Sequence, residues 1–220
     1  LTDACADLTW ALILACARRV VDGDRRVRSG AWRGFHPTLL LGLELRDATL
    51  GIFGAGRIGR AVGRRAAGFG MRILYAARGA KTEFEHETGA RRVDWTTLLR
   101  ESDVLTLHAP LTPETQGLMD DKALAAMKPD AILVNTARGG LIREEYLVDA
   151  LERGHLRAVG LDVFQQEPEV NPRILGAPRT VLLPHLGSAT EHARRRMAEI
   201  AMANLRAVLD GRPPPNPVYR

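Results

Sequence analysis

TLGIFGAGRIG, residues 49–59, joins a short apolar run to a glycine-rich loop. Residues 49–53 have the length and composition of a buried strand, and an amphipathic helical pattern begins at Ile58. The GxGxxG motif between them allows a tight turn and lets the backbone approach a pyrophosphate at the helix N-terminus. The stretch therefore predicts a dinucleotide-binding loop, and a glycine-rich turn that binds nothing is the weaker alternative. The predicted cofactor contacts are Gly54, Ala55, Gly56, Arg57, Ile58 and Gly59.

Apolar runs and helical patterns alternate through the rest of the chain. Further strand-like runs occupy residues 72–76, 104–108, 132–136, 158–163 and 181–184. Helical patterns occupy residues 58–69, 95–101, 120–127 and 143–153. Strands that alternate with helices form a parallel sheet with helices on both faces. The predicted fold class is α/β, a Rossmann-type doubly wound parallel sheet, with the dinucleotide-binding domain over residues 23–190.

The two ends of the chain differ from this alternating region. Residues 1–22 contain LTWALILACARRVV, which predicts a helix that is apolar nearly all round. Residues 30–42 are rich in Gly, Pro and aromatic residues and indicate an extended connector or interface arm. Residues 191–209 predict a final helix, which ends at Gly211 and the proline-rich tail. We expect residues 191–220 to form a segment separate from the sheet.

Composition limits the classes of function. The 220 residues are 45% hydrophobic and 26% charged, which is typical of a globular protein and argues against disorder. The net charge of +5 is scattered over amphipathic segments, so we expect no nucleic-acid partner. The longest apolar run, residues 8–17, is about half a membrane span, so we expect no membrane association.

The two cysteines do not form a disulfide framework. Cys5 and Cys16 lie eleven positions apart on one predicted helix, about 16 Å along its axis, and cannot bridge each other. The absence of a disulfide pattern favours a reducing, cytoplasmic setting. No metal site is expected.

The end of the second predicted strand indicates which cofactor is bound. NAD-selective sites place a carboxylate there for the ribose hydroxyls, whereas this chain has Ala77 followed by Arg78, with Lys81 nearby. A missing carboxylate removes repulsion of a 2′-phosphate, and the two cations can pair with it. NADP(H) is therefore favoured over NAD(H). The alternative is that Arg78 and Lys81 are solvated loop charges.

Three ionisable residues in the second half of the chain can form an acid/base site. They are Arg138 in NTARGG, Glu167 in DVFQQEP and His185 in PHLGSAT. A histidine transfers protons near neutral pH, a neighbouring carboxylate raises its pKa, and a guanidinium binds a carboxylate or polarised carbonyl. Taken singly, Glu167 could be a loop carboxylate and His185 a structural histidine. Together they indicate interconversion of a keto acid and a hydroxy acid.

Five further motifs carry a family resemblance. Besides the phosphate loop, the chain contains GFGM (68–71), LHAPLTPET (107–115), NTARGG (135–140), LDVFQQEP (161–168) and PHLGSAT (184–190). In this order they closely resemble the D-isomer-specific 2-hydroxyacid dehydrogenases, most of all the glyoxylate and hydroxypyruvate reductase branch. The resemblance implies that Arg138 contacts the substrate carboxylate and keto oxygen. It also implies that Glu167 orients His185, which protonates the keto oxygen as hydride arrives from the nicotinamide.

The resemblance also implies further cofactor contacts. Asp162 matches an aspartate that bonds the nicotinamide carboxamide, with a turn-capping role as the alternative. Pro110 and Thr136 match contacts at strand ends, and Gly187 lets the backbone approach the nicotinamide. His108 is interpreted as a packed histidine and left out of the site.

Two expectations concern parts outside the sheet. Phe35 stands where related reductases often have an aromatic that reaches the partner subunit's site, which implies a homodimer, although ordinary packing is equally consistent. Full-length family members begin with a substrate-domain segment of about a hundred residues, a size typical of half a domain. We therefore expect a fragment, in which residues 1–22 and 191–220 are remnants of an incomplete substrate domain and leave apolar surface bare; the alternative is that a partner covers that surface.

Two other functions remain open at this point. A non-catalytic, dinucleotide-sensing corepressor could keep the same fold and residues, although no regulatory tail is evident. An NAD-linked D-3-phosphoglycerate or D-lactate dehydrogenase is the other alternative, and Ala77 with Arg78 argues against it.

Overall fold

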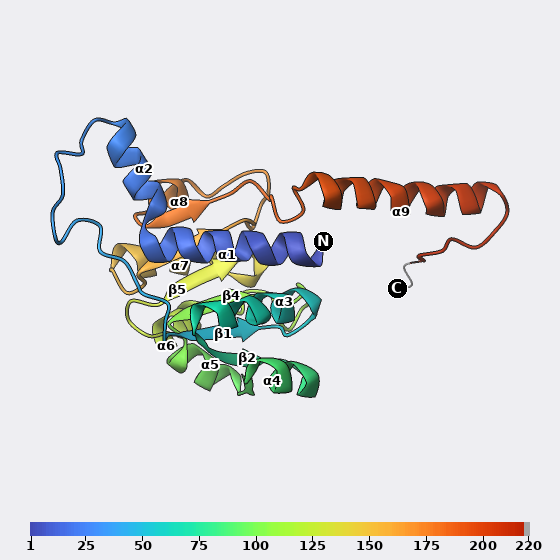
Figure 1. Ribbon diagram of the computed structural model, residues 1–220, viewed down its shortest axis with the longest axis horizontal. Helices are drawn as coiled ribbons and strands as arrows, with labels where there is room; N and C mark the ends of the chain where they lie inside the picture. Colours follow the sequence, from blue (N-terminus) through green and yellow to red (C-terminus); the bar gives the residue numbers. More distant parts are fainter. Residues whose placement is uncertain (218–220) are drawn as a thin grey trace.

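Seven parallel strands form one sheet in the computed structural model, which describes residues 1–217 (Figure 1). The spatial order is β3-β2-β1-β4-β5-β6-β7, so the winding direction reverses between β1 and β4. Ligands of such sheets bind at the carboxyl ends of the strands beside this reversal. The predicted fold class is confirmed. The strands are β1 (Thr49–Phe53), β2 (Arg72–Ala76), β3 (Arg91–Arg92), β4 (Val104–Leu107), β5 (Ile132–Asn135), β6 (Ala158–Leu161) and β7 (Thr180–Leu182).

Helices cover both faces of the sheet and enclose two apolar cores. One core lies under α1, α3 and α4, and the other lies under α5, α6, α7 and α8. β1, β2, β4, β5 and β6 are almost wholly buried between them, as apolar runs without polar alternation require, whereas β7 is half-buried and β3 is exposed. The helices are α1 (Thr2–Arg18), α2 (Val20–Arg28), α3 (Arg57–Ala66), α4 (Thr82–Thr88), α5 (Trp95–Glu101), α6 (Asp121–Ala126), α7 (Glu144–Glu152), α8 (Pro172–Gly176) and α9 (Glu191–Leu209), with short 3-10 turns at Ala67–Phe69 and Gly139–Leu141.

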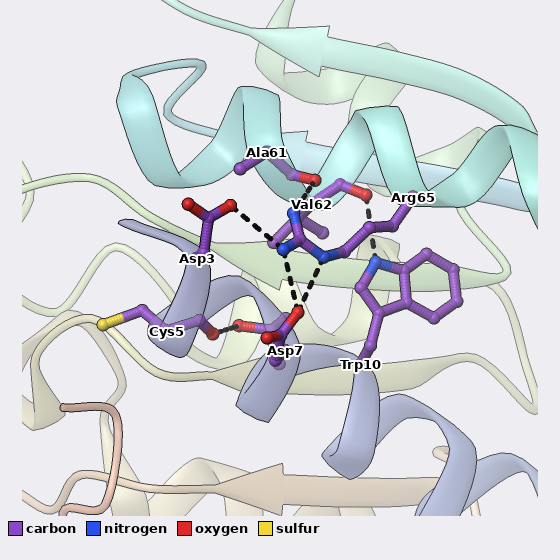
Figure 2. A network of polar contacts seen from close by, with 8 residues as sticks. Asp3, Cys5, Asp7, Trp10, Ala61, Val62 and Arg65 are labelled. Atoms are coloured by element: carbon purple, nitrogen blue, oxygen red, sulfur yellow. Dashed lines mark hydrogen bonds and ion pairs between the residues drawn. The ribbon is translucent and has the colours of Figure 1, made fainter. Parts of the chain in front are cut away.

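The first helix is an integral part of the sheet domain. α1 contacts α3 and the strands β5, β6 and β7. Trp10 is 5% exposed, donates to the Val62 carbonyl at 3.0 Å and stacks on Phe69. Figure 2 shows Asp3 and Asp7 of α1 beside Arg65 of α3, which they pair with at 3.1 and 2.8 Å. The expectation of bare apolar surface on this helix is therefore wrong, because the large apolar side chains of α1 are buried against the sheet and α3.

The last helix has the opposite character. α9 extends away from the sheet (Figure 1) and buries only Ala193 and Ala207. Its exposed apolar side chains, between 42% and 76% accessible, are Met197, Met202, Leu205, Val208 and Leu209. The expected bare surface is thus present on this helix.

The apolar pattern of the sequence did not predict four elements, because few of their side chains are buried. α2 is highly charged and buries none of its residues, and a left-handed Arg19 (φ 53°) separates it from α1. α4 buries only Phe84, and the two arginines of β3 are exposed. α8 buries only Ile174. Within residues 1–217, no helix is both long and apolar enough to cross a membrane.

Candidate active site

The phosphate loop begins directly after β1 and needs its glycines for different reasons. Gly54 has φ +96°, and a Cβ there would lie 2.7 Å from the backbone of His108 and Ala109. A Cβ on Gly59 would overlap the Gly54 carbonyl, so Gly59 is required for the helix to pack on the loop. A Cβ on Gly56 would meet nothing within 4 Å. Gly56 therefore leaves open space where a pyrophosphate would approach the start of α3, and the loop fits a dinucleotide.

A cleft adjoins this loop and gathers half of the predicted cofactor contacts. Its lining includes Gly54, Ala55, Gly56, Arg78, Lys81 and Pro110. Of the other residues predicted in the loop, Arg57 is exposed at the first turn of α3, whereas Ile58 packs into the core and Gly59 is buried. The lining also includes His108, which the sequence analysis left out. Burial lowers the pKa of His108 to about 4, so its ring is neutral at physiological pH.

Hydrogen bonds order the predicted ribose end of the cleft. The Tyr75 hydroxyl donates to Glu85 at 2.6 Å and accepts from the Lys81 amide at 2.7 Å, so it holds the start of α4 beside β2. Arg78 is exposed between these elements. Glu114 also lines the cleft. A hydrogen bond from Thr112 is the main cause that lowers the pKa of Glu114, and the charge of Arg78 adds a smaller contribution.

A buried carboxylate holds the turn that carries His185. Asp162 follows β6 and accepts hydrogen bonds from the backbone N–H groups of Leu186 at 2.6 Å and Gly187 at 2.8 Å. Its own carbonyl accepts from the His185 amide at 3.0 Å. Burial raises the pKa of Asp162, and these amide bonds partly oppose the rise. Asp162 thus makes the turn-capping contacts. The contact of Asp162 with the nicotinamide carboxamide and that of Gly187 with the nicotinamide stay predictions.

His185 and Glu167 form a hydrogen-bonded pair. His185 Nδ1 lies 2.7 Å from Glu167 Oε2, and Glu167 Oε1 accepts from the Phe164 amide at 3.0 Å. Burial by itself would raise the pKa of Glu167, but the bonds from His185 and Phe164 and the charge of Arg138 outweigh it and lower the pKa. Glu167 is therefore ionised at neutral pH and can accept a proton-bearing Nδ1. This arrangement leaves Nε2 of His185 available for another partner.

Arg138 lies on a turn that a buried amide shapes. Asn135, at the end of β5, accepts from the Ala137 amide at 3.0 Å and donates to the Arg138 carbonyl at 2.9 Å. Next in the chain, a Cβ on Gly139 would overlap the carbonyl group of Phe164, so this turn lies directly against the loop that leads to Glu167. The Arg138 side chain is exposed. Asn135 was missed in the sequence, although its place before the ARGG turn is the signal that could have found it.

Thr136 joins this edge of the sheet to α1. Its hydroxyl lies 2.9 Å from that of Thr9, which donates to the Cys5 carbonyl at 2.8 Å. The single hydroxyl proton of Thr9 is used in the bond to Cys5, so the Thr136 hydroxyl must be the donor in its bond to Thr9. The Thr136 oxygen can then still accept a hydrogen bond from another group. Its predicted cofactor contact would thus use an acceptor oxygen.

Comparison with known proteins places these features in a family. A model of the D-isomer specific 2-hydroxyacid dehydrogenase NAD binding domain matches residues 10–187. The chain belongs to the D-isomer specific 2-hydroxyacid dehydrogenases. It is an NAD(P)-dependent oxidoreductase with a nicotinamide dinucleotide as its cofactor.

Individual relatives of this dehydrogenase are similar over its whole length. A glyoxylate reductase of Thermococcus litoralis is 50% identical over 224 residues, covering 100% of this chain and 68% of that protein. One from Aeropyrum pernix is 50% identical over 226 residues, covering 100% and 67%. The crystal structure of the TT0316 protein from Thermus thermophilus superposes with a TM-score of 0.93 at 52% identity, covering 100% of this chain and 69% of that chain.

Gly139 provides a test of the contact between the two site loops. We expect Gly139→Ala to lower the free energy of unfolding by about 2 kcal/mol, because the new methyl group forces the Arg138 turn away from Phe164. Urea denaturation measures this. Gly140→Ala is the matched control, since its methyl meets only the Leu111 side chain, which can rotate, and it should cost under about 1 kcal/mol. Equal effects of the two substitutions would contradict the close approach.

Proposed function

We propose that this dehydrogenase reduces a small 2-keto acid, glyoxylate or hydroxypyruvate, to the D-2-hydroxy acid with NADPH. The observation that carries the proposal is the 2.7 Å bond between His185 and Glu167, on the loops that follow β7 and β6 at the edge where the phosphate loop also lies. The similarity to two glyoxylate reductases at 50% identity supports the choice of substrate class.

Each of the three residues has a separate role in this proposal. Glu167 accepts the proton-bearing Nδ1 of His185 and so directs Nε2 toward the substrate. The His185 imidazolium donates its Nε2 proton to the keto oxygen and becomes the neutral Nδ1–H imidazole, and in the reverse direction this imidazole accepts the proton from the hydroxyl group. Arg138 binds the substrate carboxylate and polarises the keto group through its guanidinium. Bound NADPH supplies the hydride that reaches the keto carbon.

NADPH is proposed over NADH because of the charges at the end of β2. Ala77 stands where a ribose-binding carboxylate would repel a 2′-phosphate, and Arg78 and Lys81 line the same cleft. The Tyr75 hydroxyl accepts from the Lys81 amide, so the backbone that carries Lys81 is held beside β2.

We also propose that two copies of the chain associate. Phe35 is 91% exposed in the connector, and an apolar hollow adjoins the catalytic pair, lined in part by Leu175, Leu182 and Pro184. A second copy's Phe35 in this hollow would complete a small substrate site. The exposed apolar side of α9, with the segment from residue 191 onward, would belong to the substrate domain rather than to the sheet domain.

His185 offers a direct test of the acid/base role. It has φ +57°, a left-handed conformation that Asn tolerates better than Ala, so His185→Asn removes the imidazole with the smaller backbone cost. We expect His185→Asn to lower kcat with glyoxylate by about a thousandfold and to change the Kd for NADPH by less than about twofold. Turnover assays and nicotinamide fluorescence titration measure the two quantities. A parallel loss of NADPH binding would assign His185 a structural role instead.

Arg78 offers a test of the cofactor. We expect the protein to use NADPH with a higher kcat/KM than NADH. Arg78→Ala should lower the ratio of these two kcat/KM values by about tenfold, because one charge-assisted contact to the 2′-phosphate is lost. Initial rates with each cofactor at fixed glyoxylate give the ratio. Equal kcat/KM values for the two cofactors in the unsubstituted protein would refute the NADPH assignment.

A further inference from the structure

The short strand β3 places an additional cation at the cofactor cleft. β3 pairs with the end of β2, with Arg92 opposite Tyr75. The Arg92 guanidinium donates through Nε to the Ala77 carbonyl at 3.2 Å and through Nη2 to the Arg78 carbonyl at 3.4 Å. It also lines the cleft that contains the phosphate loop. Arg92 therefore lies against the two residues that stand at the predicted ribose position.

Arg92 forms no ion pair with a carboxylate of the residues that the structure describes. Within residues 1–217 its side chain donates only to the two neutral carbonyl oxygens, and a guanidinium has five N–H donors. The carboxylates of Asp94 and Glu114 line the same cleft, and the charge of Arg78, rather than that of Arg92, helps to lower the pKa of Glu114. Two hydrogen bonds thus hold the Arg92 guanidinium in place. Its remaining N–H donors and its positive charge are available to a ligand in the cleft.

We propose that Arg92 determines specificity for the 2′-phosphate of NADP(H), as a third cation beside Arg78 and Lys81. Its two carbonyl bonds hold the guanidinium before the cofactor arrives, so little side-chain freedom is lost when a phosphate binds. A phosphate dianion matches the fork of N–H donors that an arginine offers. The proposal rests on the NADPH preference proposed above, and it adds a residue from a strand that the sequence pattern did not reveal.

The neighbouring arginine is a matched control. Arg91 belongs to the same strand and carries the same charge, but successive strand residues point to opposite faces. Its guanidinium pairs with Glu101 of α5 at 3.2 Å, and it is absent from the lining of the cofactor cleft. Removing either arginine changes the net charge of the protein equally, so the comparison separates a local contact from a general electrostatic effect.

Titration calorimetry with NADP+ and NAD+ tests the proposal on the unsubstituted protein and three variants. We expect Arg92→Gln to weaken NADP+ binding by roughly tenfold and NAD+ binding by less than about twofold. Arg92→Lys should retain part of the NADP+ affinity because it keeps the charge. Arg91→Gln should change neither affinity by more than about twofold.

The outcomes distinguish this proposal from the cofactor preference itself. Equal weakening of NADP+ and NAD+ by Arg92→Gln would show that Arg92 only supports the Ala77–Arg78 backbone, and unchanged affinities would show that it is a solvated charge. Either result overturns the proposal. If Arg78→Ala narrows the preference while Arg92→Gln does not, the NADPH assignment stands and the role of Arg92 fails. An unsubstituted protein that binds both cofactors equally overturns both.

Discussion

The geometry of the site depends on one buried carboxylate. The Asp162 carboxylate accepts hydrogen bonds from the backbone N–H groups of Leu186 at 2.6 Å and Gly187 at 2.8 Å. These bonds hold the segment after β7 at the end of β6. His185 precedes these two residues in a left-handed conformation that an isolated chain rarely adopts. The turn can hold this conformation because its amides have a fixed partner away from water. Once the turn is held, the imidazole lies within hydrogen-bond distance of Glu167.

Close backbone contacts connect the other parts of the site to the same sheet edge. Gly54 lets the phosphate loop lie against the residues that follow β4, and Gly139 lets the Arg138 turn lie against the loop that leads from β6 to Glu167. Because the strands are parallel, all these loops emerge at the carboxyl edge of the sheet, and the phosphate loop lies beside the reversal of winding direction between β1 and β4. The cofactor cleft and the acid/base pair are thus products of a single topology, which brings together residues more than a hundred positions apart.

Much of this arrangement could be predicted from the sequence, for physical reasons. Buried parallel strands are continuous apolar runs, so β1 and β2 were predicted with their observed bounds, and the motif residues fell at strand ends. Elements with few buried residues, such as α2 and β3, have no apolar run or stripe that would indicate them, and Arg92 was missed with β3. The packing of α1 on the sheet could not be predicted either, because a helix that is apolar nearly all round does not specify its neighbours. Contacts made through the backbone, such as the amide bonds of Asp162 and Asn135, depend on turn geometry that residue types alone do not determine.

The central claim is that Glu167 fixes the orientation and proton position of His185. Nitrogen-15 NMR of histidine-labelled protein at pH 9 measures which ring nitrogen carries the proton in the neutral imidazole. A bond from Nδ1 to the ionised Glu167 predicts the Nδ1–H form for His185, and Glu167→Gln should diminish this preference. A dominant Nε2–H form of His185 in the unsubstituted protein would contradict the account, because Glu167 would then not be holding the proton-bearing nitrogen and Nε2 would not be set to exchange a proton with the substrate.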